Sequence, residues 1–481
     1  MTQPAHAGAP DPDARPSPSE AAAALPLNAR DGLTPVGVPV AHAATLVRGD
    51  LRAVVRRVAV PAVASNLLMT LFASVDAYWV GTRVGARGLA AVSTSLFWIW
   101  MIVALAEMVA VGLTAVAARR HGEGRGTEAA RTAGDAVLFA VALGLTVAVL
   151  GLLFTDRLFA LMGTPPEVTA LGRTYLQTYL LGAPLLYGYF AVDATFRASG
   201  NTRTPFVLLA ASVAVTLVLD PVLILGLWGA PRLGIAGAAV ATVSTRSAVF
   251  VMGLALLRRR GLLRFGTPRA ATVGAVARIG LPTAATGIFF SLIYVLLTRV
   301  TTRFGTPALA ALGLGHRIEN WLYMIALGFG AAAAAVVGQN LGAGRPDRAE
   351  RAGWVSVGYG SMPALVIAAL MLLAPETMAG WFTTDGAVIA ETARYLRIAS
   401  VSMLVLCSEV VLEGALGGAG ATIPPMLAST TLTAARLPLA WWLTTLFGAA
   451  GLWWTISLTA AARGIAMAVL WRSGFWKKRR A

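Results

Sequence analysis

Long apolar stretches alternate with short polar segments from Leu51 almost to the end of the chain. Each stretch has about 20 residues or more, the length that a helix needs to cross a hydrocarbon core of roughly 30 Å. We therefore predict twelve membrane-spanning helices. In the first half they cover residues 54–80, 89–117, 133–155, 168–196, 204–228 and 235–257. In the second half they cover 276–302, 309–337, 352–374, 388–416, 424–447 and 451–471.

The two halves of the chain repeat each other at a shift of 220 residues. This shift aligns three separated loops without a gap: 80–91 with 300–311, 121–125 with 341–345, and 199–205 with 419–425. Six spans are an even number, so both halves enter the membrane in the same orientation and are related by an axis along the membrane normal. We predict an all-α integral membrane protein of two six-helix lobes related by a pseudo-two-fold axis. This is the plan of a transporter that rocks its lobes around a central site.

The pattern also divides the chain into segments. Residues 1–48 are rich in Pro and Ala and are predicted to be a disordered cytoplasmic tail. The first lobe covers 49–257 and the second 276–472. A cytoplasmic linker, 258–275, joins the lobes, and a basic C-terminal tail covers 473–481.

Composition agrees with a membrane location. The 481 residues are 57% hydrophobic and 13% charged, and the mean hydropathy is +0.71, whereas soluble domains carry roughly 25% charge. A soluble enzyme is therefore excluded. The single cysteine, Cys407, lies in an apolar run, so neither an intramolecular disulfide nor a cysteine metal cluster is expected.

The net charge of +17 does not indicate a nucleic-acid partner, because the basic residues punctuate apolar spans. The loops after the second, fourth, sixth and eighth spans, with the two tails, hold most of the arginines. Under the positive-inside rule this distribution places both termini in the cytoplasm of a multi-pass plasma-membrane (inner-membrane) protein. No Gly-x-x-x-x-Gly-Lys-Ser/Thr loop occurs, so an ion gradient is expected to drive transport.

Three aspartates fall inside spans of the first lobe: Asp76, Asp193 and Asp220. A carboxylate inside a membrane needs a partner, a cation, water or a proton. Thr216 lies one helical turn before Asp220, and Pro221 frees backbone carbonyls there. These groups are candidates for a site that holds a proton or a sodium ion. Asp193 has an alternative role as an ion-pair partner of Arg197, four residues later.

The second lobe does not copy this charge pattern. At the repeat shift, Asp76 faces Leu296 and Asp220 faces Ala440, whereas Asp193 faces Glu413. Charged and aromatic side chains within spans are candidates for a substrate cavity, since organic cations favour acidic groups and aromatic faces. They are Glu107, Tyr187, His316, Glu319, Glu409 and Glu413.

Three of these candidates have alternatives. His316 either assists proton transfer or is a hydrogen-bonded histidine near Arg317. Glu107 either faces the cavity or pairs with an arginine. Aromatic residues such as Tyr187 also commonly face lipid or the membrane interface.

Four motifs in order carry a family resemblance. They are residues 61–76 with Val80 and Gly81, the loop Arg197-x-x-Gly-Asn-Thr-x-x-Pro205, residues 219–226 with 233–242, and Gly338-Gln-Asn-Leu-Gly-Ala-Gly344. Together they resemble the prokaryotic MATE (multidrug and toxic compound extrusion) transporters over about residues 50–470. The resemblance implies a cation-coupled antiporter that exports amphipathic, often cationic organic compounds by alternating access. It also implies a functional monomer without a cofactor other than the coupling ion.

In proton-coupled prokaryotic branches of that family, the aspartates of helices one and five belong to the ion-coupling centre, which matches Asp76 and Asp220. The same resemblance gives Asp76 and Asp220 as the place for Na⁺ if sodium is the coupling ion. Some members carry cation-binding carboxylates in helices seven and ten. Span ten here offers Glu409 or Glu413, but span seven has no acid.

Protons are the favoured coupling ion and sodium is the alternative. A competing function is a lipid-linked oligosaccharide flippase of related architecture, which favours an arginine-rich cavity. Here the arginines lie mostly at the ends of spans. A channel is disfavoured because filter-like loops and rings of charge are absent from the sequence.

Overall fold

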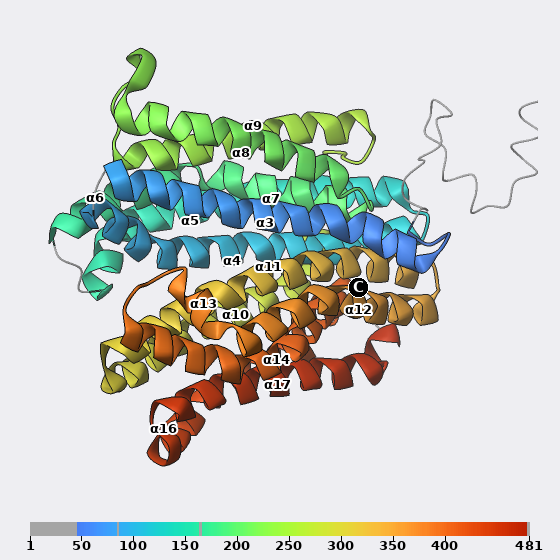
Figure 1. The fold of residues 1–481 in the computed structure, drawn as a ribbon. Coiled ribbons are helices and arrows are strands. Elements are labelled where there is room, and N and C mark those ends of the chain that lie inside the picture. Colours follow the sequence, from blue (N-terminus) through green and yellow to red (C-terminus); the bar gives the residue numbers. More distant parts are fainter. Residues whose placement is uncertain (1–45, 84–85, 163–165, 479–481) are drawn as a thin grey trace, which may run out of the picture.

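A computed structural model describes residues 46–83, 86–162 and 166–478, and this part of the chain is almost entirely α-helical, with no strand (Figure 1). In an apolar medium a helix satisfies its own backbone hydrogen bonds, which explains why the apolar stretches adopt this form. The helices of the first lobe are α3 (Leu51–Arg83), α4 (Ala86–Gly122), α5 (Gly126–Met162), α6 (Pro166–Leu181), α7 (Ala183–Ala198), α8 (Arg203–Leu225) and α9 (Ile235–Arg259). Those of the second lobe are α10 (Ala270–Thr301), α11 (Gly305–Gly342), α12 (Pro346–Leu373), α13 (Pro375–Gly380), α14 (Gly386–Gly418), α15 (Ile423–Ala434), α16 (Arg436–Phe447) and α17 (Ala449–Arg472).

Each predicted span falls on one helix or on a pair of helices. Ten helices in the described ranges are individually long and apolar enough to cross a membrane. The fourth span is divided into α6 and α7, and the eleventh into α15 and α16. Pro184 and Pro438 follow these two breaks, and a proline cannot donate the amide hydrogen bond that continues a helix. The all-α fold with twelve spans is confirmed.

The two lobes lie against each other, with α3–α9 in one half and α10–α17 in the other (Figure 1). Between the lobes, α3 packs on α11 and α4 packs on α10. The repeat shift maps α3 onto α10 and α4 onto α11, so a pseudo-two-fold axis exchanges these two contacts. The interface therefore has the symmetry that the repeat predicts.

Glycines bring the lobes into backbone contact. A Cβ atom on Gly280 of α10 would lie 1.8 Å from the carbonyl oxygen of Met108 on α4. A Cβ atom on Gly342 of α11 would lie 2.0 Å from the carbonyl oxygen of Arg119, and its repeat partner Gly122 meets the backbone of α11 in the same way. All of these contacts lie in the C-terminal halves of α4 and α11 and in the N-terminal half of α10. The lobes are therefore closed against each other at that end.

The segment before α3 is packed between the lobes, which corrects the predicted extent of the disordered tail. Leu46 is fully buried and contacts Gly200. The side chains of Asn340 and Arg345 donate hydrogen bonds to the carbonyl oxygens of Leu46 and Val47, at 3.3 and 3.1 Å. These second-lobe side chains fix a segment that composition alone assigned to the tail. Residues 1–45 of the predicted tail lie outside the described residues.

The linker between the lobes is shorter than predicted. Helix α10 begins at Ala270 instead of residue 276. The amide of Arg264 donates to the carbonyl oxygen of Ala130, and Arg269 pairs with Asp135 at 2.9 Å. Both contacts attach the linker to α5. Asp135 is almost fully buried, and the sequence analysis did not single it out.

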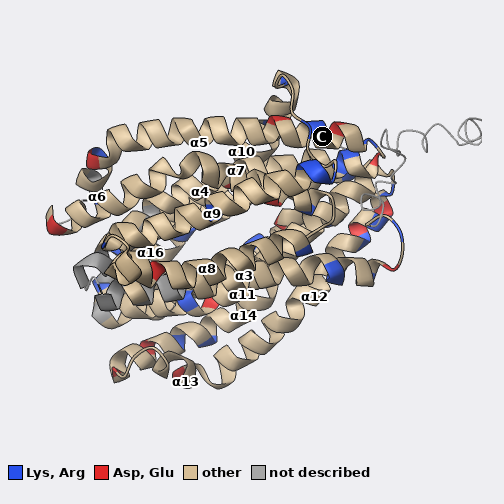
Figure 2. Cartoon of the chain, turned by 90° about the horizontal axis from the view of Figure 1, so that it is seen from above, with Lys and Arg blue, Asp and Glu red and all other residues tan. Residues whose placement is uncertain are grey.

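Basic side chains gather at the end of the molecule where the C-terminus lies (Figure 2). Some are neutralised locally: Lys477 lies 2.6 Å from Glu350 and 3.6 Å from Asp347. The hydrogen bond to Glu350 raises the pKa of Lys477. This concentration of basic side chains at one end agrees with the distribution of arginines among the loops in the sequence.

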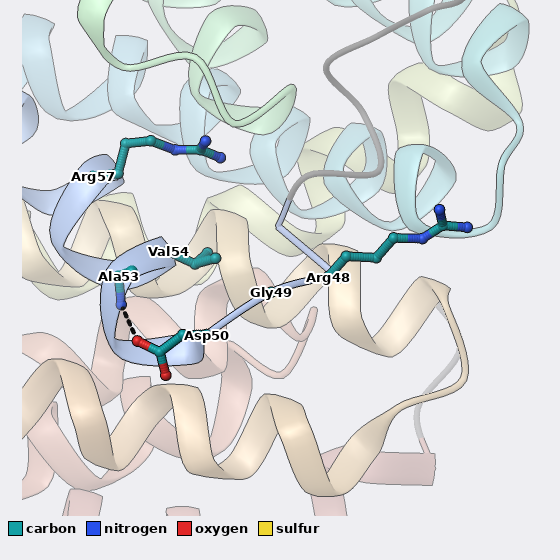
Figure 3. A pocket seen from close by; sticks show the side chains of 6 residues that line it. All are labelled: Arg48, Gly49, Asp50, Ala53, Val54 and Arg57. Carbon is teal, nitrogen blue, oxygen red and sulfur yellow. Dashed lines mark hydrogen bonds between the residues drawn. The ribbon is translucent and has the colours of Figure 1, made fainter.

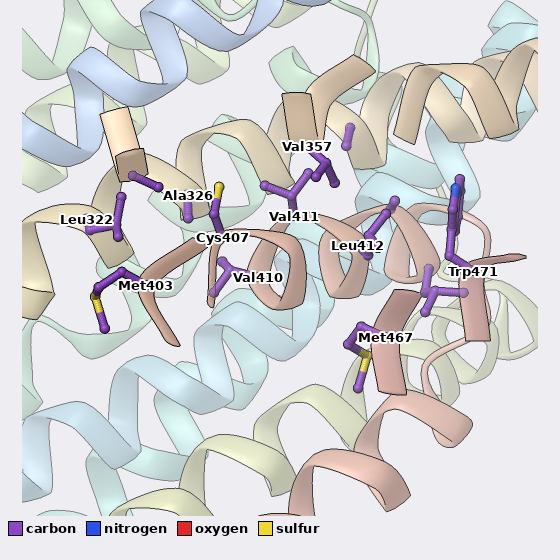
Figure 4. Packing of buried hydrophobic residues seen from close by; sticks show 14 of the residues in the cluster. Leu322, Ala326, Val357, Met403, Cys407, Val410, Val411, Leu412, Met467 and Trp471 are labelled. Atoms are coloured by element: carbon purple, nitrogen blue, oxygen red, sulfur yellow. The ribbon is translucent and has the colours of Figure 1, made fainter. Parts of the chain in front are cut away.

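Cys407 lies in the apolar core of the second lobe (Figure 4). It is fully buried beside Met403, Val411 and Leu412 of its own helix, and it contacts Gly360 of α12. The residue therefore has the packing role expected for a thiol in an apolar run.

Candidate functional site

One of the first-lobe candidates is a buried carboxyl group. Asp220 is fully buried in α8, next to Pro221. One turn earlier, the Thr216 hydroxyl donates to the Ser212 carbonyl oxygen and lies 2.8 Å from the hydroxyl of Thr245 on α9. The packing of α8 on α9 thus places two hydroxyl groups on the turn before the carboxyl group. Oxygen atoms of this kind hold a proton or a hard cation.

Asp76 lies within α3, but its side chain is outside the described residues. Helix α3 packs on α8, the helix of Asp220. Among the described side chains, no group of three or more His, Cys, Asp or Glu residues could hold a metal ion, and Asp76 is not part of that set. The predicted role of Asp76 stays a prediction.

Asp193 has the ion-pair partner that the sequence offered as its alternative. Its carboxylate lies 2.6 Å from the Arg197 guanidinium, four residues later on α7. Arg246 of α9 donates a hydrogen bond of 3.3 Å to the hydroxyl of Tyr189 on α7. Arg246 is 4% exposed, and its guanidinium lies over the ring of Tyr189 at 5.2 Å. The first lobe therefore has a buried cation that the sequence analysis missed.

Acidic candidates from both lobes lie on helices that pack together at the lobe interface. Glu107 of α4 is exposed, Tyr323 of α11 is 41% exposed, and Glu413 of α14 is partly buried. Helix α4, which carries Glu107, packs on α11, which carries Tyr323, and on α14, which carries Glu409 and Glu413. The arrangement joins Glu107, from the first lobe, to the acidic candidates of the second.

Glu409 forms a buried ion pair. Its carboxylate lies 3.1 Å from Arg463 of α17, and both side chains are less than 10% exposed. Arg463 also donates to the hydroxyl of Thr433 on α15. The second carboxylate oxygen of Glu409 has no hydrogen-bond partner among the described residues. Glu409 is therefore already paired with a cation of the protein itself.

Glu319 and His316 form a second polar group in the same lobe. The Tyr395 hydroxyl donates to Glu319 at 2.8 Å, and the His316 Nδ1 lies 3.4 Å from the same carboxylate. The ring of Tyr294 packs edge-on against His316, with centroids 4.5 Å apart. His316 is thus held by Glu319 and Tyr294, and this geometry matches the hydrogen-bonded alternative of the sequence analysis.

Arg436 gives the second lobe a further buried cation. It is 1% exposed at the start of α16, and its Nε donates to the Thr459 hydroxyl at 2.8 Å. Its guanidinium lies over the rings of Phe290 and Tyr294, at 5.7 and 5.2 Å. At the repeat shift Arg436 takes the position of Thr216. The equivalent positions of the two lobes therefore carry opposite chemistry, hydroxyls beside an acid in one and an arginine in the other.

Three arginines lie buried inside spans, as exceptions to the prediction that arginines lie mostly at span ends. They are Arg246, Arg436 and Arg463. An arginine within an apolar run is a signal of function in a membrane protein, and it was available in the sequence.

Tyr187 does not line a cavity, which corrects its assignment to the substrate site. The side chain is 1% exposed in the core of the first lobe. Its hydroxyl donates to the carbonyl oxygen of Ile102 at 2.7 Å and so joins α7 to α4. A buried tyrosine hydroxyl needs such a partner, so this residue is explained by packing.

The matches to known proteins follow the division of the chain into two lobes. A family model described as MatE matches the chain twice, over residues 61–222 and 282–442, which together make up more than half of its length. Each match falls within one lobe. The two matches agree with the internal repeat.

Several characterised proteins are similar over most of the chain. The probable multidrug resistance protein NorM of Thermotoga maritima is 26% identical over 445 residues, covering 89% of this chain and 94% of the relative. An FAD transporter of Shewanella oneidensis is 28% identical over 359 residues, covering 73% of this chain and 79% of the relative. The solved structure of a MOP superfamily transporter from Pyrococcus furiosus has a TM-score of 0.84 at 22% identity, covering 92% of this chain and 99% of that chain. At that identity the structural likeness supports the fold alone.

Proposed function

The chain belongs to the MatE family and is a multi-pass membrane transporter, and from this premise we propose that it exports amphipathic, often cationic organic compounds in exchange for a cation. Protons are the proposed coupling ion, and sodium is the alternative. The names of relatives such as NorM support drug export. Both termini are proposed to lie in the cytoplasm, at the end where the basic side chains gather.

The observation that carries ion coupling is the burial of Asp220. A fully buried carboxyl group in a span is costly in its charged form unless a cation or a partner compensates it. Binding and release of a proton, or of a sodium ion held also by hydroxyls such as Thr216, would change that cost during each cycle. Asp76, on the neighbouring helix, is proposed to share the ion. This centre lies in the first lobe.

Coupling is proposed to reside in the first lobe alone. In the second lobe Arg463 already neutralises Glu409 at 3.1 Å, and Arg436 stands where the first lobe has Thr216. A fixed guanidinium cannot leave during the cycle, so it removes the need for a mobile cation at that position.

Substrate is proposed to bind between the lobes. Glu107 on α4 and Glu413 on α14 lie on helices that pack across the lobe interface, and α4 also packs on α11, which carries the partly exposed Tyr323. A cationic aromatic compound would find both negative charge and a ring face between these helices. The lobes are closed at one end by glycine contacts. Rocking of the lobes about these helices is proposed to expose the site to each side in turn.

A second candidate substrate class is an aromatic anion. The buried guanidinium groups of Arg246 and Arg436 lie over aromatic rings, and one relative is an FAD transporter. Such a substrate would bind arginines instead of the acids around Tyr323. Uptake into proteoliposomes, measured once with FAD and once with a cationic dye, separates the two substrate classes.

The proposal is tested with the purified chain in proteoliposomes. With an acidic lumen, wild-type protein should accumulate ethidium as protons leave, and an outward sodium gradient alone should not drive uptake. Asp220→Asn should insert but fail to accumulate ethidium. The matched control is Asp156→Asn, because Asp156 forms an exposed pair with Arg173 and should be dispensable. Uptake driven only by sodium would change the coupling ion, and full uptake by Asp220→Asn would remove this residue from the mechanism.

A further inference from the structure

Two hollows on the outer surface of the first lobe each contain a pair of arginines. The first, of about 380 Å³, lies between Arg48 and Arg57 at the start of α3 (Figure 3). The second, of about 260 Å³, lies between Arg203 at the start of α8 and Arg260 after α9. Neither belongs to the transport site described above.

The two hollows are neighbours. The Thr202 hydroxyl donates a hydrogen bond of 2.8 Å to the carbonyl oxygen of Val58. Arg57 precedes Val58 and Arg203 follows Thr202, so this bond places the two arginines on adjoining segments. The two hollows therefore lie on adjoining segments of α3 and α8.

These arginines have no carboxylate partners. No salt bridge joins Arg48, Arg57, Arg203 or Arg260 to an acid among the described residues, whereas other arginines at this end are paired. Asp50 lines the first hollow, but its carboxylate accepts the amide hydrogen bond of Ala53 at 2.9 Å. The second hollow has no acidic lining residue. The lining of the two hollows thus holds four arginines against one carboxylate, so the patch keeps a net positive charge.

The hollows lie where the apolar surface of the spans ends. Val60, about one turn along α3 from Arg57, is 62% exposed. Val207 forms part of the wall of the second hollow and is 53% exposed, next to Leu256. Exposed valine on a membrane span faces acyl chains, so the adjacent arginines lie at the depth of lipid phosphates.

We propose that these paired hollows bind the phosphate group of an anionic phospholipid, with the acyl chains along Val207 and Leu256. Arginine suits this ligand because its planar guanidinium donates pairs of hydrogen bonds to phosphate oxygens. The apolar wall distinguishes a lipid from a free phosphate ion, which would gain nothing from Val207. This proposal does not depend on the transported substrate or on the coupling ion.

The test measures binding of a short-chain phosphatidylglycerol to the full-length protein in neutral detergent. Wild-type protein should bind it, and phosphatidylcholine of the same chain length should bind far more weakly. Arg57→Gln and Arg203→Gln should each raise the Kd about fivefold, and together about 25-fold. All of these side chains are exposed, so the variants should keep the wild-type melting temperature.

The matched control is Arg157→Gln, an exposed arginine near the opposite end of α5 that should leave the Kd unchanged. Inorganic phosphate is the competitor, because it distinguishes a site for a phospholipid headgroup from a site for free phosphate. Displacement of the lipid by equimolar phosphate would show that the site recognises the free ion, and this result would overturn the proposal. Unchanged lipid affinity in the double variant would overturn it as well.

Discussion

The buried pair of Glu409 and Arg463 offers a quantitative test of the second lobe. The two charged groups lie 3.1 Å apart, and their side chains are 6% and 7% exposed. At an effective dielectric constant of about 20, this separation corresponds to an attraction of about 5 kcal/mol. Desolvation offsets most of that gain, so the intact pair contributes little net stability compared with apolar residues.

Removing one partner has a different cost from removing both. Glu409→Gln leaves the Arg463 guanidinium buried, with the Thr433 hydroxyl at 3.3 Å as its hydrogen-bond partner besides the new amide. A single removal of this kind is expected to cost about 3–5 kcal/mol. The double variant Glu409→Met with Arg463→Met should recover most of the loss, because neither charge remains. Glu409→Met and Arg463→Met alone complete the cycle.

The assay is reversible unfolding of the four proteins in detergent, analysed as a double-mutant cycle. The structure predicts a coupling energy of about 2–4 kcal/mol between the two side chains, within the cost of breaking a buried pair. A coupling energy below about 0.5 kcal/mol, as for an exposed pair, would refute the buried contact between α14 and α17. It would also mean that Arg463 does not neutralise Glu409, and the proposal that coupling resides in the first lobe alone depends on this pair.

Three further predictions follow from single contacts. Gly280→Ala should lower the free energy of unfolding by about 1–3 kcal/mol and increase labelling of engineered cysteines at the closed end, because its Cβ atom would overlap a backbone carbonyl of α4. The control is Gly358→Ala, whose Cβ atom would have open space and which should be neutral or slightly stabilising. Glu413→Gln should weaken binding of a cationic dye without changing the ratio of ions to dye moved, and a changed ratio with unaltered affinity would place coupling in the second lobe. Tyr187→Phe should lower stability by about 1 kcal/mol through loss of its hydrogen bond to α4 and leave dye affinity unchanged; a large loss of affinity would restore Tyr187 to the substrate site.

The architecture was predictable because its signals are local. Apolar length identifies spans, and a constant shift identifies the repeat, without knowledge of which helices touch. The breaks in the fourth and eleventh spans lie just before prolines that the sequence shows. The apolar pattern alone predicted one continuous helix for each of these spans. The extent of the N-terminal tail was misjudged because Leu46 is fixed by side chains almost 300 residues away.

The site was only partly predictable, because a charge in a sequence does not reveal its partner. Glu409 was a cavity candidate until its pairing with Arg463, 54 residues later, became visible. Tyr187 was misassigned because its exposure depends on the packing of α7 against α4. The role of Arg436 was not predictable, because its burial depends on Thr459 of α17 and on the ring of Tyr294 of α10, which the sequence does not place beside it.

The central claim is obligatory exchange of substrate for protons through Asp220, and the most direct test is to let the substrate alone drive the ion. Proteoliposomes loaded with a cationic dye and a luminal pH indicator are diluted into dye-free buffer of equal pH without sodium. Because coupling is reciprocal, wild-type protein should acidify the lumen as dye leaves, and Asp220→Asn should not. Dye efflux through the wild-type protein with no change in luminal pH would contradict proton-coupled export.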